Sequence, residues 1–138
     1  MGWYDSPTNL YIAMEYLPVG DLQAYLSERT PLNEKEAREI THQTLEGLDH
    51  MHREGFAHRD VKPGNLLIKS HSPDLWWVKL SDFGISKRSE ASAEQLSTFK
   101  GTVSFMAPEL FGYEPGSPYM VNHQAADMWS LGEWCFAC

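Results

Sequence analysis

The sequence predicts an α+β fold. Two patterns predict it: a long series of apolar residues at helical spacing in the first half of the chain, and short apolar runs of strand length that flank polar turns. The 138 residues are enough for one domain with a buried core. No apolar run approaches about 18 residues, so the sequence predicts no membrane span.

The first elements are expected to be a strand and a short helix. Residues 10–14 form an apolar run that ends at Glu15, which predicts a buried strand. A Pro-Val-Gly break follows, and Asp21 can cap a helix that continues to about Arg29.

The longest element is expected to be a helix over about residues 34–54. Asn33 and Glu36 have the spacing of a capping box, and Gly55 ends the pattern as a C-terminal glycine does. Residues that recur at helical spacing are Ala37, Ile40, Thr44, Leu45, Leu48 and Met51.

A β-hairpin is expected next. The apolar residues 66–68 and 78–80 flank a polar turn at residues 71–74. The neighbouring Trp76 and Trp77 are interpreted as packing residues of this hairpin rather than a cation or ligand site.

The last third of the chain is expected to begin as loops and end as a helix. Residues 82–109 are polar and show little periodicity, and residues 112–123 contain two prolines. A second helix is expected from residue 124 to residue 138.

Charge and cysteine content exclude some classes of protein. Lys plus Arg number 11 and Asp plus Glu number 19, which gives a net charge of −8. This balance argues against a general binder of nucleic acid or anionic membranes, because both need clustered positive charge. The two cysteines, Cys135 and Cys138, do not suggest a disulfide framework. They favour a reducing, intracellular location, cytoplasmic or nuclear.

Three motifs carry the chemistry. HRDVKPGN occupies residues 58–65, DFG occupies residues 82–84, and APE occupies residues 107–109. Their joint occurrence in this order by chance is below roughly one in a million. Over almost the whole chain the sequence resembles the eukaryotic protein kinase family, and in particular its serine/threonine type.

The resemblance implies a set of catalytic residues. Asp60 is expected to accept or orient the proton of a substrate hydroxyl, and Lys62 to steady the transferred phosphate. The lysine at this position favours a serine or threonine substrate. Asn65 and Asp82 are expected to supply oxygen ligands to Mg²⁺, whose charge offsets that of ATP.

The resemblance also implies an adenine site. Met14 resembles the gatekeeper at its back, and Leu67 the aliphatic residue of its floor. The Glu15 carbonyl and the Leu17 amide are expected to bond the base. Asp21 is expected either to contact the ribose or simply to cap the short helix, and the sequence leaves both roles open.

Regulatory residues are implied in the same way. Thr98 resembles an activation-loop phosphorylation site, and Arg59 is expected to pair with its phosphate. Thr102 is expected to hydrogen-bond Asp60 and Lys62, which again marks the serine/threonine type.

Three further residues have expected structural roles. His58 is expected to pack beneath Phe83 and not to act as a base. Asp127 is expected to bond the backbone of the catalytic loop. Glu133 falls on a helix that the resemblance implies is buried, where an unpaired carboxylate costs several kcal/mol.

Residues 1–138 are therefore expected to be a partial kinase domain, from the hinge through the start of a long buried helix. A mostly helical C-lobe with short hairpins is expected, and an N-lobe that is largely missing. The sequence contains no Gly-x-Gly-x-x-Gly loop and no Val-Ala-x-Lys strand before residue 10. The 138 residues alone are expected to bind ATP weakly at most, to transfer phosphate at a negligible rate, and to be poorly soluble or molten.

The functional hypothesis is an ATP-dependent serine/threonine protein kinase that uses Mg²⁺ and acts on a protein Ser or Thr. The alternative is a kinase remnant without catalysis that serves as a binding or scaffold protein. The first hypothesis requires Asp60, Asn65 and Asp82 to converge below an adenine slot walled by Met14 and Leu17.

Overall fold

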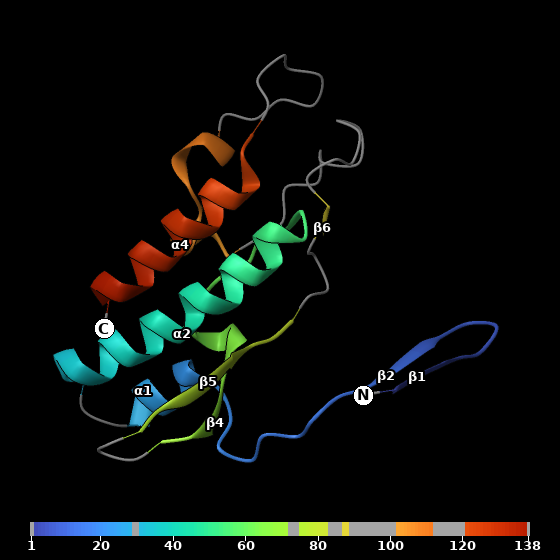
Figure 1. The fold of residues 1–138 in the computed structure, drawn as a ribbon, viewed down its shortest axis with the longest axis horizontal. Coiled ribbons are helices and arrows are strands. Elements are labelled where there is room, and N and C mark those ends of the chain that lie inside the picture. The colour runs from blue at the N-terminus through green and yellow to red at the C-terminus, as the bar shows by residue number, and fades with distance from the viewer. Residues whose placement is uncertain are drawn as a thin grey trace.

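The computed structural model confirms the α+β class, with helices and short antiparallel strand pairs (Figure 1). It describes residues 2–28, 31–71, 75–82, 87–88, 102–111 and 121–137. The elements in chain order are β1 (Gly2–Asp5), β2 (Leu10–Ala13), α1 (Leu22–Glu28), α2 (Glu34–Arg53), β3 (Phe56–Ala57), β4 (Leu66–Ser70), β5 (Trp77–Leu80), β6 (Lys87–Arg88) and α4 (His123–Ala137). Single 3-10 turns cover Pro63–Asn65, Val103–Phe105 and Pro108–Leu110.

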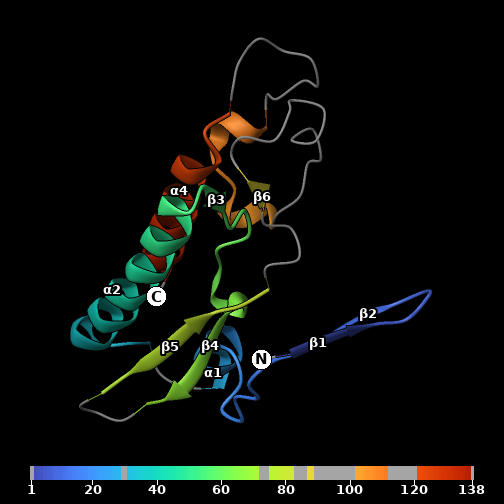
Figure 2. The same cartoon turned by 45° about the vertical axis from the view of Figure 1, so that its right-hand side comes forward.

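The first strand expected from the sequence is one half of a hairpin. β2 pairs antiparallel with β1, with Trp3 opposite Ile12 and Tyr4 opposite Tyr11. The expectation that residues 10–14 are buried is wrong, because every residue of both strands is exposed. The reason is visible in Figures 1 and 2, where the hairpin stands away from the other described elements.

The capping residues act as the sequence predicts. Asp21 Oδ1 accepts the Ala24 amide at 2.8 Å and caps α1. Asn33 and Glu36 form the reciprocal capping box of α2, and Gly55 follows the helix with a φ of 79°, which favours glycine. The helix bounds expected from the sequence are therefore close to the observed ones.

The apolar face of α2 packs on the β4–β5 hairpin. Ile40, Thr44 and Leu48 are buried, whereas Leu45, expected on the same face, is 36% exposed. A Cβ at Gly47 would lie 2.8 Å from Cδ1 of Leu80. The helix and β5 therefore approach as closely as a glycine permits.

Gln43 on α2 bonds directly to the backbone beside and within β5. Its Nε2 donates to the Trp76 carbonyl at 2.7 Å, and its Oε1 accepts the Val78 amide at 3.0 Å. These bonds satisfy main-chain groups that the pairing with β4 leaves over.

The two adjacent tryptophans have different environments. Trp76 is 2% exposed and meets Tyr25 edge to face at 5.1 Å, so the packing interpretation is correct for it. Trp77 is 47% exposed, and the ammonium of Lys69 lies 3.9 Å from the centre of its ring. The interpretation was wrong for Trp77, because successive side chains of a strand point to opposite faces.

The core lies between α2, the β4–β5 hairpin and α4, and α4 runs beside α2 in both views (Figures 1 and 2). Its members are Leu22, Ile40, Leu48, Val61, Leu66, Ile68, Trp76, Val78, Leu131 and Trp134. Glu133 is exposed, which corrects the expectation of a buried carboxylate: the side chain points away from the core, while its neighbour Trp134 is fully buried. No helix in the described ranges is long and apolar enough to cross a membrane.

Candidate functional site

The segment that carries the first motif joins β3 to β4 and is anchored by His58. This side chain is fully buried. Its Nε2 lies 2.9 Å from the Ser81 carbonyl, and its Nδ1 accepts the Asp60 amide at 3.3 Å. The two bonds together require the tautomer with hydrogen on Nε2. His58 thus acts as a packed spacer, as expected, while Phe83 lies outside the described residues.

Asp60 is the centre of a hydrogen-bond cluster. Its Oδ1 accepts the Thr102 amide at 3.1 Å and the Thr102 hydroxyl at 3.0 Å. Its Oδ2 accepts the Lys62 ammonium at 2.7 Å and the Asn65 amide at 3.0 Å. Lys62 also donates to the Thr102 hydroxyl at 2.7 Å. The expected contacts of Thr102 with Asp60 and Lys62 are therefore present.

These donors set the charge state of Asp60. Burial raises the pKa of its carboxyl, but the hydrogen bonds from Lys62, Thr102 and Asn65 outweigh burial and hold the pKa below its ordinary value of 3.8. Asp60 is consequently ionised at neutral pH, as a hydroxyl acceptor must be.

Asn65 and Asp82 flank the β4–β5 pair, one before its first strand and the other after its second. Asn65 precedes β4, and its carbonyl accepts both the amide and the hydroxyl of Ser81, at 2.9 and 3.0 Å. Asp82 follows Ser81 and takes a left-handed backbone with φ 61°. The strand pairing thus brings Asn65 and Asp82 to the same end of the hairpin.

The chemistry of this donor pair fits Mg²⁺. Asn65 Nδ2 donates to the carbonyl and to the carboxylate of Asp60, so its Oδ1 faces away from Asp60. The Asp82 side chain is exposed. An amide oxygen and a carboxylate are the hard ligands that Mg²⁺ takes. Among the described residues, no group of three or more His, Cys, Asp and Glu side chains is placed to hold a metal.

Asp127 on α4 holds the backbone of the HRDVKPGN segment, residues 58–65, in place. The carboxylate is 1% exposed and accepts the amides of His58 and Arg59, at 2.8 and 2.7 Å. The expected bond to the loop backbone is therefore present. A third partner, not expected from the sequence, is His52 at the end of α2, whose Nε2 lies 2.8 Å from the same carboxylate. No motif marks His52; only the packing of α2 against α4 reveals it.

Arg59 has a constrained backbone. Its φ is 72°, a conformation that costs a non-glycine residue about 1–3 kcal/mol and persists only where the surroundings enforce it. The hydrogen bond from the Arg59 backbone amide to the Asp127 carboxylate supplies that restraint. Burial lowers the pKa of the guanidinium, and the charge of Asp127 opposes the shift. Thr98, the expected phosphate site, lies outside the described residues.

The residues expected to hold adenine are brought together only in part. Asp21 and Leu67 form an isolated antiparallel β-bridge, and the Gly20 carbonyl accepts the Ile68 amide at 2.9 Å. Leu17 is 9% exposed, whereas Met14 is 67% exposed. The last residues before α1, Gly20 and Asp21, therefore lie against β4. The cap of Asp21 is observed, and its ribose contact remains an expectation.

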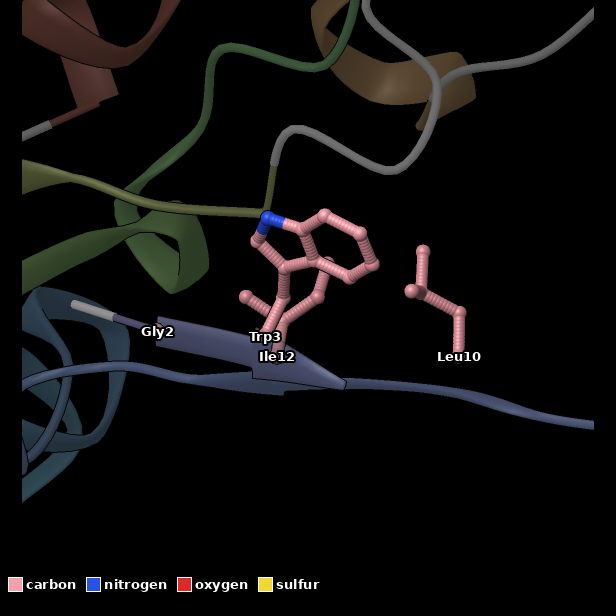
Figure 3. Close-up of a pocket in the computed structure, with 4 residues that line it drawn as sticks. All are labelled: Gly2, Trp3, Leu10 and Ile12. Atoms are coloured by element: carbon pink, nitrogen blue, oxygen red, sulfur yellow. The ribbon is translucent and has the colours of Figure 1, made fainter. Parts of the chain in front are cut away.

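An apolar hollow lies elsewhere, on the β1–β2 hairpin. It is lined by Gly2, Trp3, Leu10 and Ile12. Figure 3 shows the side chains of Trp3, Leu10 and Ile12 on one face of the hairpin, as the strand register requires. None of the motif residues that the structure describes lines it.

Comparison with known proteins gives a consistent match. The family model described as the protein kinase domain matches residues 1–138. CBL-interacting serine/threonine-protein kinase 8 of Arabidopsis thaliana is 38% identical over 127 residues, which cover 92% of this chain and 26% of that protein. Serine/threonine-protein kinase cds1 of Schizosaccharomyces pombe is 34% identical over 129 residues, 94% of this chain and 27% of that protein.

A human relative matches over the same extent. Death-associated protein kinase 2 of Homo sapiens is 33% identical over 129 residues, which cover 94% of this chain and 33% of that protein. The chain thus spans about a quarter to a third of the length of these three relatives.

Proposed function

Because the chain belongs to the protein kinase family, we propose that it carries the catalytic loop of an ATP-dependent serine/threonine kinase. The reaction is transfer of the terminal phosphoryl group of Mg-ATP to a Ser or Thr hydroxyl of a protein. The observation that supports this most directly is the closed cluster in which Asp60 accepts bonds from Lys62, Asn65 and Thr102. The similarity to two serine/threonine-protein kinases is a second support.

In the proposed reaction Asp60 orients the substrate hydroxyl. Its lowered pKa keeps it ionised, but also makes it a weak base. Such a carboxylate aligns the hydroxyl for in-line attack and takes its proton late, after the bond to phosphorus has begun to form.

Lys62 is proposed to leave Asp60 when the substrate binds. The carboxylate accepts four hydrogen bonds, which is its full capacity, so an incoming hydroxyl must displace a donor. Lys62 is the donor free to move, because the Thr102 and Asn65 groups are fixed by backbone and burial while Lys62 sits on a flexible four-carbon stem. Its ammonium then faces the transferred phosphate.

Asn65 and Asp82 are the proposed magnesium ligands. When bound, Mg²⁺ supplies positive charge that neutralises the triphosphate oxygens. The residues of this chain contribute the two oxygens and the rigid pairing of β4 with β5 that sets their separation.

The segment before α1 and the start of β4 are proposed to hold the nucleotide. In this proposal the Glu15 carbonyl and the Leu17 amide bond the base, and Met14 and Leu67 contact its faces. Asp21 pairs with Leu67 through a backbone bridge and caps α1, and in this proposal it also contacts the ribose.

Thr98 and Arg59 are proposed to regulate the site. A phosphate on Thr98 would pair with the guanidinium of Arg59, next in the chain to Asp60. A charge-assisted bidentate bond of this kind would order the segment that ends at Thr102.

The proposal is tested by nuclear magnetic resonance titration of the 138-residue chain with Mg²⁺ and a non-hydrolysable ATP analogue. Saturable shifts are expected at the amides of Leu17 and Leu67, with weak affinity. In Asp82→Asn the binding is expected to lose its dependence on Mg²⁺. The matched control is Asp49→Asn, which removes an exposed carboxylate paired with Arg53 on α2 and is expected to leave the titration unchanged.

The outcomes separate the two functional hypotheses. A chain without catalysis that serves as a scaffold predicts no saturable, Mg²⁺-dependent binding in any variant. Phosphotransfer from labelled ATP to a serine peptide is expected to be near background for the 138 residues alone. Any rate above background must fall to background in Asp60→Asn; turnover that survives this substitution contradicts the role of Asp60.

A further inference from the structure

The two faces of the β4–β5 hairpin have different characters. Leu66, Ile68 and Val78 point into the core and are buried. The alternation of side chains along a strand puts the intervening residues on the other face, which carries Leu67, Lys69, Trp77 and Lys79. The register pairs Leu67 directly with Lys79.

One acidic side chain from outside the β4–β5 hairpin, that of Glu15, binds the two lysines of this outer face. Glu15 Oε1 lies 3.4 Å from the Lys69 ammonium, and Oε2 bonds to Lys79. The Lys69 ammonium lies 3.9 Å from the centre of the Trp77 ring, and that of Lys79 lies 5.9 Å from it. Two cations therefore share one carboxylate and one aromatic ring, an arrangement in which each attraction offsets the repulsion between the lysines.

Glu15 connects the segment after the β1–β2 hairpin to the outer face of β4 and β5. Within the described ranges, the hydrogen bonds and ion pairs of residues 2–16 lie inside the β1–β2 hairpin, except those of Glu15. The next contact with β4 along the chain is the Gly20 carbonyl. Among the described residues, Glu15 thus makes the contact with β4 and β5 that lies nearest in the chain to the β1–β2 hairpin. The β1–β2 hairpin itself stands apart from the other described elements (Figures 1 and 2).

We propose that Lys69 and Lys79 are positioning residues for the nucleotide. By binding the Glu15 carboxylate, the two lysines hold the backbone of residues 15–17 at a fixed distance from Leu67. Leu67 lies on the same outer face of the β4–β5 hairpin as the lysines. The inference rests on the proposed function, because it assigns these lysines a role at that site although neither touches the nucleotide. The pair preorganises the site and reduces the fraction of chains in which the segment lies elsewhere.

The test uses the same titration of the 138-residue chain with Mg²⁺ and the non-hydrolysable ATP analogue. In Lys69→Met/Lys79→Met the dissociation constant is expected to rise about two- to tenfold, the range of a few exposed ion pairs. Lys69→Arg/Lys79→Arg is expected to restore binding. The matched control is Lys35→Met, which removes a lysine paired with Glu39 on α2 and is expected to leave the dissociation constant unchanged.

A double-mutant cycle identifies Glu15 as the link. Glu15→Gln is expected to weaken binding by a similar factor, and Glu15→Gln combined with both Lys→Met changes is expected to be no weaker than the lysine variant. Residual dipolar couplings give a readout without nucleotide: residues 2–13 and 34–53 share one alignment in the wild type, and the couplings of residues 2–13 shrink in the lysine variant.

The outcomes distinguish this inference from the function on which it rests. If the wild type binds no nucleotide, the proposed function fails and this inference fails with it. If the wild type binds and the lysine variant binds equally well, only the inference is overturned. Unchanged dipolar couplings in the lysine variant also overturn it, whatever the affinity.

Discussion

The charge of Asp60 is governed by its immediate neighbours. Four donors converge on one carboxylate, two from Thr102 and one each from Lys62 and Asn65. Because the pKa of Asp60 is lower when folded than its ordinary value of 3.8, ionisation of this group stabilises the folded chain at neutral pH. This contribution is complete above the ordinary pKa and is lost as the pH falls through the lowered pKa.

Thr102→Val tests this balance. The variant keeps the backbone amide donor and removes the hydroxyl donor, so burial opposes fewer hydrogen bonds. We expect the pKa of Asp60 to rise toward 3.8, measured by carbon-detected titration of the carboxyl resonance. Thr102→Ser, which keeps a hydroxyl, is expected to leave the pKa low. An unchanged pKa in the valine variant would show that the Thr102 amide, Lys62 and Asn65 are sufficient to keep the pKa of Asp60 low.

At the scale of elements, Asp127 connects three parts of the chain. The carboxylate belongs to α4, accepts the amides of His58 and Arg59, and meets His52 at the end of α2. It is also the restraint on the left-handed backbone of Arg59. The position of residues 58–65 therefore depends on how α2 and α4 pack.

Asp127→Ala is expected to lower the free energy of unfolding by about 3–5 kcal/mol, because it leaves two backbone amides and a histidine without their buried partner. Urea unfolding followed by circular dichroism measures this change. Met128→Ala, at the neighbouring position, is the control, since that side chain is 44% exposed, and it is expected to cost less than about 1 kcal/mol. A loss as small as the control's in Asp127→Ala would contradict the anchoring role.

The contact between α2 and β5 makes a second element-scale prediction. Alanine is about 1 kcal/mol better than glycine in a helix, but a Cβ at Gly47 would lie 2.8 Å from Leu80. Gly47→Ala is therefore expected to raise the free energy of unfolding by clearly less than about 1 kcal/mol when Leu80 is present. In a Leu80→Ala background the full gain of about 1 kcal/mol is expected, measured as the difference between two urea unfolding curves. Equal gains in both backgrounds would show that Leu80 moves aside without cost.

At the scale of the whole molecule, local signals predicted most elements. The capping box of Asn33 and Glu36 and the glycine at position 55 marked α2, because these signals act within one turn of helix. The apolar runs marked β4 and β5. The family resemblance also predicted that Thr102 and Asp127 bond residues 58–65, as they do.

Burial and long-range pairing were less predictable. The run at residues 10–14 indicated a strand, but not that it is exposed, because burial depends on what packs against it. The partner strand β1 was missed, and so was the contact of His52 with Asp127, since neither follows from spacing. Glu133 was misassigned because the inner face of α4 is decided by its packing against α2.

The exposed hairpin leads to a prediction about the molecule as a whole. Trp3 and Ile12 are 72% and 61% exposed, so Trp3→Ser/Ile12→Ser is expected to change the free energy of unfolding by less than about 1 kcal/mol. The same variant is expected to bind less of an apolar fluorescent dye, because it removes exposed apolar area. Leu48→Ala, in the core, is the contrasting control and is expected to cost about 2–5 kcal/mol. A comparable cost in the hairpin variant would show that the hairpin is packed in solution.

The ring of His58 bonds the Ser81 carbonyl through one nitrogen and the Asp60 amide through the other. The rigid imidazole ring therefore connects Ser81, the residue before Asp82, to Asp60, which is proposed to orient the hydroxyl. A tilt of the ring would therefore move the backbone at Ser81 and at Asp60 together, and we expect a substitution that displaces one of them to displace the other.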